Sequence, residues 1–480
     1  MTVLIALALL VVFSSSVYFL GRRRALALAG PSPASLHSLP GYHGTWVALW
    51  AGAPAALILI LFVVFGGQLE ESALRAQVPA AVAELPAERQ DVFWGDALSI
   101  ARGETASAVA WDGEVKAALN AKADEARAIG FYGLIIVMAL AGVLALAGFL
   151  LAFPRLSREF RARNRVEGWT NALLILCSTV AVLTTVGIIA SLAWESLRFF
   201  QAVPPVDFLL GTEWNPQIAM RSDQVAAEGA FGAVPLFAGT FLVMIIAMAV
   251  AAPIGLFSAI YLAEYASPAL RSTVKPLLEI LAGVPTVVYG FFAALTVGPI
   301  FRAFFNGIGA LLVGGPMDEL GQFLEQVQNQ MALTAGVVMG IMLIPFVSSL
   351  SDDIINAVPQ SLRDGSYAMG ATKSETVKRV VLPAALPGIV AALLLAVSRA
   401  VGETMIVTMA AGLQAKLTAN PLETVTTVTV QIVTLLTGDQ EFDSPKTLAA
   451  FGLGLTLFVV TLGLNIFALA IVRKYREQYD

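Results

Sequence analysis

Two charged residues, Arg399 and Glu403, lie four positions apart inside a long apolar run, with Gly402 beside them. A charge at the centre of a membrane helix costs about 2.5–3.5 kcal/mol on insertion scales, so both side chains should avoid lipid. A spacing of four predicts one helical face, and Gly402 should allow a neighbouring helix to approach. A guanidinium fork suits an oxyanion. The pattern predicts either an anion contact at Arg399, with Glu403 orienting it and helping to release the ion, or a structural ion pair that locks the bundle or the interface with a partner.

A second segment, 282–290, reads Ala-Gly-Val-Pro-Thr-Val-Val-Tyr-Gly. Gly283 and Pro285 are expected to break an apolar run near its start. Broken membrane helices release backbone groups that cavity-lining segments present to a substrate, and Thr286 would lie at such a break. A proline kink that neighbouring helices accommodate by packing is the alternative.

The polar stretch 351–384 predicts two short helices separated by a glycine. Ser361 would cap the start of the first helix, and Gly370 would end it in the left-handed conformation. Thr372 and Glu375 have the spacing of a capping box at the start of the second. A rigid helix–glycine–helix unit suits the groove of a partner protein. An ordinary connector with capped helices is the alternative.

The elements that position these residues are membrane helices. The chain has 58% hydrophobic and 13% charged residues and a mean hydropathy of +0.78, whereas soluble domains have about 25% charged residues. Runs of about 20 apolar residues match the bilayer thickness. The nine predicted spans are approximately Val3–Leu20, Trp46–Phe65, Phe131–Phe153, Asn171–Ala193, Val234–Leu262, Leu277–Phe301, Ala332–Leu350, Leu386–Ala411 and Leu448–Val472.

The distribution of charge predicts the orientation. With nine spans, every basic cluster falls on one side, which the positive-inside rule makes cytoplasmic. The N-terminus is then periplasmic and the C-terminus cytoplasmic. Segment 68–129, with eleven acidic and six basic residues, is predicted to be periplasmic and helical. The basic clusters are a loop with Arg22–Arg24; Arg155, Arg158, Arg161, Arg163 and Arg165; Arg271 and Lys275; Arg363, Lys373, Lys378 and Arg379; and Arg473, Lys474 and Arg476.

The polar stretch resembles the cytoplasmic coupling loop of importer permeases of the ATP-binding-cassette (ABC) class. In that family an acidic residue and two small residues precede a glycine, and a branched aliphatic residue followed by Leu-Pro comes later in the loop. Pro383 is expected to stop the second helix before the next span. Asp-Gly-Ser stands here where the family has Glu-Ala-Ala. The positions that carry the resemblance are Asp364, Gly365, Ser366, Gly370, Val380, Leu382 and Pro383.

Segments 398–404 and 282–290 are similar to those of permease subunits of phosphate-specific ABC importers. The resemblance covers Trp169 to the C-terminus. It implies an all-α polytopic membrane protein: a type I importer core of six helices in 166–480, preceded by three additional helices in 1–165. It implies a substrate pathway lined by Arg399, Glu403, Thr404 and Thr286.

The resemblance also implies the partners: a dimeric ATPase subunit, a second permease subunit of the PstA kind, and a periplasmic phosphate-binding protein, all at a bacterial inner membrane. No lysine directly follows a glycine, so the chain lacks the usual phosphate-binding loop, and ATP would be used by the separate ATPase. The chain itself is expected to be no enzyme and to bind no cofactor, metal or nucleic acid. A permease for molybdate or sulfate, a carrier or channel without an ATPase, and a membrane scaffold or sensor remain alternatives.

Overall fold

The computed structural model describes residues 2–30, 35–107, 109, 111–216, 229–437 and 444–476. Within these residues the secondary structure is helical, apart from one pair of two-residue strands. The chain forms two compact units, Met1–Leu183 and Thr184–Asp480. The boundary between the units falls within helix α6 (Ala162–Ala202), and the boundary predicted from sequence, 165/166, lies near the start of that helix.

Nine helices of the described residues are long and apolar enough to cross a membrane, which confirms the predicted number of spans. Their lengths, between 25 and 41 residues, exceed the roughly 20 residues that the hydrocarbon core requires. The nine segments are Ile5–Ala29, Pro40–Arg75, Gly113–Ala152, Ala162–Ala202, Val234–Tyr265, Thr286–Leu312, Ala332–Ala357, Lys373–Val401 and Pro445–Ile471.

Several predicted span ends are wrong, and three of them bear on the residues discussed below. Arg22–Arg24 lie inside α1 (Thr2–Ala29) and not in a loop, because arginine is a good helix former and the helix continues to a left-handed Gly30. The sixth span begins only at Thr286, after the helix break. The eighth span ends at Val401, ten residues before its predicted end at Ala411.

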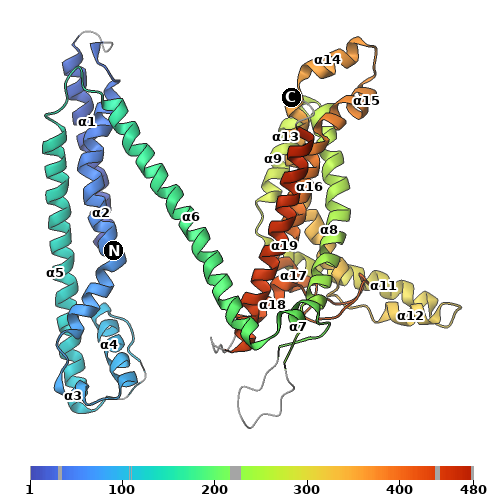
Figure 1. Ribbon diagram of the computed structural model, residues 1–480, viewed down its shortest axis with the longest axis horizontal. Helices are drawn as coiled ribbons and strands as arrows, with labels where there is room; N and C mark the ends of the chain where they lie inside the picture. Colours follow the sequence, from blue (N-terminus) through green and yellow to red (C-terminus); the bar gives the residue numbers. More distant parts are fainter. Residues whose placement is uncertain are drawn as a thin grey trace. The chain divides into compact units, whose positions relative to one another are not determined.

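In the first unit, helices α1, α2 (Pro40–Arg75) and α5 (Gly113–Ala152) run side by side (Figure 1). Helices α2 and α5 approach closely at Gly148, where a Cβ atom would overlap the carbonyl group of Trp50. Small residues allow membrane helices to pack at such short distances.

The acidic segment between the second and third spans is helical, as predicted. It consists of the end of α2, α3 (Ala80–Ala83), α4 (Ala87–Arg102) and the start of α5. Asp96 is buried and accepts three hydrogen bonds: from the Ser107 backbone N–H at 2.7 Å, the Ser107 hydroxyl at 2.8 Å and Trp111 Nε1 at 2.9 Å. This carboxylate fixes the loop that connects α4 to α5.

The second unit contains the remaining elements. Helices α14 and α15 lie at one end of the helix bundle, and α7 and α18 lie toward the other end (Figure 1). The elements are α7 (Pro205–Leu210), β1 (Trp214–Asn215), β2 (Ala230–Phe231), α8 (Val234–Ile260), the π-helix η2 (Tyr261–Tyr265), α9 (Pro268–Ala282), α10 (Thr286–Phe292), the π-helix η3 (Ala293–Val297), α11 (Gly298–Leu312), α12 (Asp318–Glu325), α13 (Ala332–Ala357), α14 (Gln360–Ala368), α15 (Lys373–Thr376), the π-helix η4 (Val377–Val381), α16 (Leu382–Val401), α17 (Met405–Ala410), α18 (Val428–Leu435) and α19 (Pro445–Arg476).

Helices α8 and α13 form the central pair of the second unit and run parallel. Three glycines set their contact: a Cβ on Gly336 would lie 2.6 Å from Ile246 Cβ, one on Gly340 2.8 Å from the Ala247 carbonyl oxygen, and one on Gly255 2.8 Å from Val347 Cβ. Because these glycines allow close packing along most of the two helices, α8 and α13 form a tightly packed pair.

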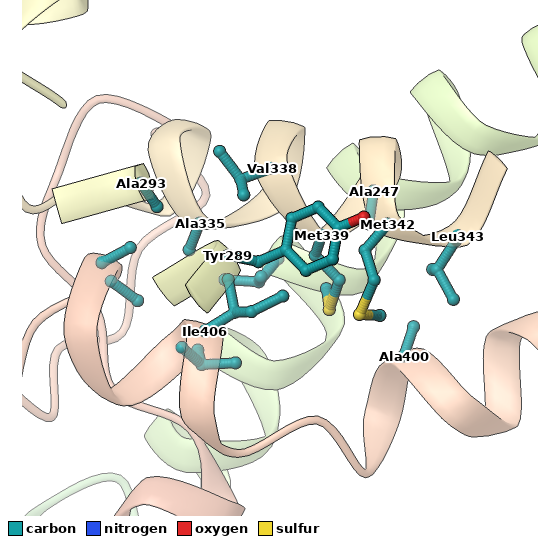
Figure 2. Packing of buried hydrophobic residues seen from close by; sticks show 14 of the residues in the cluster. Ala247, Tyr289, Ala293, Ala335, Val338, Met339, Met342, Leu343, Ala400 and Ile406 are labelled. Carbon is teal, nitrogen blue, oxygen red and sulfur yellow. The ribbon is translucent and has the colours of Figure 1, made fainter. Parts of the chain in front are cut away.

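The main hydrophobic core of the second unit lies between this pair and helices α10, α16 and α17. Tyr289 lies beside Met339 and Met342 of α13, with Ala400 of α16 and Ile406 of α17 nearby (Figure 2). The core therefore lies directly against segments 282–290 and 398–404, and it includes Tyr289 and Ala400 from them.

Candidate translocation pathway and coupling surface

The eighth span breaks between Arg399 and Glu403. Helix α16 ends at Val401, Gly402 caps it, and the chain restarts as α17 at Met405. The prediction that Arg399 and Glu403 share one helical face is therefore wrong. Gly402 is exposed, and a Cβ there would meet only carbonyl groups of its own helix, so its predicted role in helix approach is also wrong.

The Glu403 carboxylate turns toward the start of α17. Its Oε1 accepts hydrogen bonds from the backbone N–H groups of Met405 at 3.1 Å and Ile406 at 3.4 Å. The first N–H groups of a helix have no partner within the helix, so a carboxylate at this position stabilises them. Glu403 is committed to the backbone, and its own carbonyl group accepts a hydrogen bond from the Thr429 hydroxyl at 2.8 Å.

Arg399 lies in the last turn of α16, where the helix dipole favours a cation. Its side chain is exposed, and its guanidinium carbon lies 5.4 Å from the centre of the Phe346 ring of α13. Among the ion pairs of the described residues, none includes Arg399. The guanidinium is therefore positioned by a helix end and an aromatic ring, with its hydrogen-bond donors not committed to a carboxylate.

A second break separates α9 from α10. Helix α9 ends at Ala282 and α10 begins at Thr286, which confirms the predicted interruption at Gly283 and Pro285. The Tyr289 hydroxyl donates to the Leu281 carbonyl oxygen at 2.9 Å, so a side chain of α10 bonds one of the carbonyl groups near the end of α9. Thr286 is half-buried in the first turn of α10.

The two breaks lie next to each other because α10 packs on α17. A Cβ on Gly290 would lie 2.7 Å from Met409 Sδ and 3.1 Å from the Met405 carbonyl oxygen. Thr404, half-buried, directly precedes α17. The structure thus brings the two sequence segments together where α10 and α17 begin. In the described part of the chain, no three potential metal ligands cluster.

The predicted coupling loop has the expected helix–glycine–helix form, with one difference at its start. Gly370 is left-handed, with φ of 82°, and Thr372 and Glu375 form the predicted capping box. Ser361 does not cap α14, because the helix already begins at Gln360 after Pro359. A proline before the helix fixes the backbone dihedral at the start without a side-chain cap.

Pro383 does not stop the second helix, contrary to prediction. Helix α15 continues through the π-helix η4 into α16, and Pro383 lies in the first turn of α16. The wider turn of a π-helix leaves room for a residue that lacks an N–H donor. Lys373–Val401 is therefore one continuous span.

The outer surface of the coupling loop is exposed. Asp364 and Gly365 are exposed and Ser366 is half-buried, while Met369 at the tip is 88% exposed. Nearer the membrane helix, Val380 and Leu382 are half-buried and Pro383 is exposed.

A charged cluster around Asp352 was not predicted from the sequence. Asp352 of α13, 2% exposed, accepts hydrogen bonds from Arg271 Nη2 at 2.9 and 3.0 Å, from Lys275 Nζ at 2.9 Å and from Asn356 Nδ2 at 3.0 Å. Hydrogen bonds to Asp352 and then to Asp353 raise the pKa of Lys275. The spacing of Arg271 and Lys275 on one face of α9 is the only signal in the sequence. The cluster holds α9, which buries no side chain of its own, to α13.

The fold and site define a polytopic helical membrane protein with an exposed helix–glycine–helix loop at one end of its second unit. Two family models match the chain: "Phosphate ATP-binding cassette transporter" over residues 4–184, and "Binding-protein-dependent transport system inner membrane component" over residues 251–477. The first region includes the first three spans, and the second includes both helix breaks and the coupling loop.

Curated relatives agree. The chain is 30% identical to the probable ABC transporter permease protein YqgH of Bacillus subtilis, over 64% of this chain and 90% of that protein. It is 31% identical to the phosphate transport system permease protein PstC of Haemophilus influenzae, over 67% of this chain and 98% of that protein. The chain therefore belongs to the ABC transporter permeases, whose members are non-catalytic membrane subunits.

A solved structure of the MetNI methionine ABC transporter is also similar, with 18% identity over 51% of this chain and 94% of that chain. Its TM-score of 0.32 is too low to add to the assignment.

Proposed function

We propose that this chain is the permease subunit of an ATP-driven phosphate importer at a bacterial inner membrane. Arg399 is the anion contact, Glu403 holds the start of α17 beside it, and Thr286 and Thr404 line the pathway at the two breaks. The curated relatives named as phosphate permeases and the "Phosphate ATP-binding cassette transporter" match support the choice of phosphate.

One observation carries the proposal: an exposed arginine without a carboxylate partner lies where α16 and α17 separate, next to the break between α9 and α10. A guanidinium can donate two parallel hydrogen bonds to a tetrahedral oxyanion. The cost of a charge at such a position is difficult to explain unless it faces water or an anion.

The coupling loop supports the second half of the proposal, which is energy supply. Loop 351–384 presents an exposed helix–glycine–helix surface for a dimeric ATPase that binds and hydrolyses ATP, while this chain binds no cofactor. A second permease subunit of the PstA kind and a periplasmic phosphate-binding protein complete the assembly. The C-terminus and the coupling loop are cytoplasmic, and the N-terminus and the acidic segment are periplasmic.

Uptake of radiolabelled phosphate into vesicles that contain the assembly tests the proposal. Uptake should require ATP inside the vesicles, where the ATPase can bind it. Excess unlabelled phosphate should block the uptake of the label. Sulfate and molybdate serve as competitors, because an arginine fork alone does not separate tetrahedral oxyanions. Stronger competition by either anion than by phosphate would identify another cargo, and uptake without ATP would identify a carrier or channel.

A further inference from the structure

The coupling loop is attached to the membrane helices by one buried ion pair. Arg363 of α14 donates to Glu264 Oε1 from Nη2 at 2.9 Å and from Nε at 3.1 Å. The two side chains are 9% and 8% exposed, and no other ion pair within the described residues has both partners so deeply buried. The Arg363 guanidinium also donates to the carbonyl groups of Val358 at 2.6 Å and Ile355 at 2.8 Å, at the end of α13.

Arg363 is the anchor of α14, since it is the only buried side chain of that helix. Helix α15 attaches to the neighbouring residue: Lys373 Nζ lies 5.3 Å from the centre of the Tyr265 ring. A hydrogen bond of 2.8 Å between the hydroxyl groups of Ser366 and Thr376 joins the two halves of the loop. Both short helices are thereby attached to two consecutive residues, Glu264 and Tyr265.

These two residues end the π-helix η2, which continues α8 directly. Turns of π-helix are rare in proteins as a whole, but those that occur are frequently found at functional sites. The glycine contacts described above pack α8 tightly on α13, and Ala247 and Ala251 of α8 belong to the core around Tyr289 and Ile406 (Figure 2). Unbroken packing therefore leads from the coupling loop through η2 and α8 to the helix breaks.

We propose that the Glu264–Arg363 ion pair is the joint through which movement of the coupling loop is transmitted to α8 and to the helix breaks. The inference rests on the proposed docking of the loop on an ATPase. Glu264 and Arg363 are positioning residues: they touch neither cargo nor nucleotide. A buried pair suits this role because its geometry is fixed, whereas an apolar contact can slide.

The test must separate transmission from folding. Removing one partner strands a buried charge and destabilises the subunit. The double variant Glu264→Gln/Arg363→Gln strands no charge and is the informative one. The matched control is Lys416→Gln/Glu423→Gln, which removes an ion pair of the same unit outside the coupling loop.

Three quantities are measured in the complete assembly, in a Cys177→Ser background. They are the protein level, cross-linking of a cysteine at Met369 to the ATPase, and phosphate uptake per ATP hydrolysed. The neutral double variant should keep its level and its cross-link but lose about tenfold in uptake per ATP, a typical coupling between distant sites. The control variant should match the wild type.

Wild-type uptake per ATP in the neutral double variant would overturn the proposal, because the pair would then contribute only to folding. Loss of the protein or of the cross-link would overturn it as well. A separate measurement does not depend on the identity of the cargo. In the absence of phosphate, addition of ATP should change the rate at which a thiol reagent labels a cysteine at Gly402. A wild-type assembly that shows this change but no phosphate uptake refutes the phosphate proposal and leaves the joint to be tested by labelling.

Discussion

At the scale of single residues, the separation of Arg399 from Glu403 changes what each is expected to do. Glu403 bonds the backbone of α17, and Arg399 lies over Phe346 with its donors exposed. The structure thus resolves the two alternatives of the sequence in one respect: the pair does not lock the bundle as an ion pair. The anion-contact role of Arg399 stays a prediction.

Arg399→Lys keeps the charge but removes the planar fork, so phosphate uptake below saturation should fall about ten- to hundredfold, the equivalent of one or two charged hydrogen bonds. Uptake is measured together with the protein level and the amount of bound ATPase, both of which should be unchanged. Arg302→Lys in α11 is the control and should transport normally. Equal uptake in both variants would exclude Arg399 as the anion contact.

Glu403→Gln should leave the protein level unchanged, because the amide oxygen can still accept from the N–H groups of Met405 and Ile406. Transport should fall if the negative charge takes part in release of the anion. Quantitative immunoblotting beside uptake distinguishes the cases. Degradation of the Gln variant would show that the carboxylate is needed for folding.

Asp96 makes a pH-dependent contribution in the acidic segment. Burial raises its pKa, but hydrogen bonds from Ser107 and Trp111 outweigh burial and lower the pKa from 3.8. A lowered pKa in the folded state stabilises the fold fully above pH 3.8, and this contribution is lost as the pH falls through the folded value. Asp96→Asn should weaken the segment by about 2–4 kcal/mol at neutral pH, since it removes charged hydrogen bonds.

Hydrogen exchange of α4, corrected for intrinsic rates, measures this effect in the full chain. Wild-type protection should fall below pH 3.8, while the variant, already less protected, should change less there. Asp91→Asn removes an exposed partner of Arg75 and should alter protection little. Identical protection in wild type and Asp96→Asn at neutral pH would contradict the role assigned to the carboxylate.

At the scale of elements, the turn at Gly370 sets the angle between α14 and α15. Its φ of 82° is unfavourable for a branched residue by about 1–2 kcal/mol, and no atom lies within 4 Å of a Cβ there, so only the backbone conformation is affected. Gly370→Val should therefore reduce uptake per ATP hydrolysed while the subunit still inserts in the membrane. Asparagine tolerates the left-handed region, so Gly370→Asn should retain transport.

Gly365→Ala is the matched control, because Gly365 lies within α14 and also has open space at its Cβ. It should transport normally and stabilise the helix slightly. The ATPase activity and the uptake of all three variants are compared at equal protein level. Normal coupling in Gly370→Val would show that the turn does not orient the docking surface.

At the scale of the whole molecule, the distribution of charge predicts the orientation in the membrane. In a Cys177→Ser background, a cysteine at the exposed Glu104 should react with an impermeant thiol reagent in intact cells whose outer membrane admits it. A cysteine at the exposed Ser157 should react only after the inner membrane is opened. Labelling of Ser157 in intact cells would reverse the topology and place the coupling loop outside.

The sequence by itself determined the class of the molecule, the number of spans, the break at Gly283–Pro285, the left-handed Gly370 and the capping box. Each depends on local chemistry: apolar length, missing donors, glycine dihedrals and side chains that reach their own backbone. Membrane spans are readable because the bilayer forces every backbone group to be bonded within its own segment.

Only the tertiary structure decided which charges meet. Glu264 and Arg363 are 99 residues apart, and Asp352 joins a helix some 80 residues earlier, so no spacing in the sequence could pair them. The end of α16 at Val401 and the continuation of α15 through Pro383 depend in the same way on packing and on a π-helical turn. Long-range pairs and helix ends are settled by the balance of burial and hydrogen bonding across the whole bundle, which no local pattern contains.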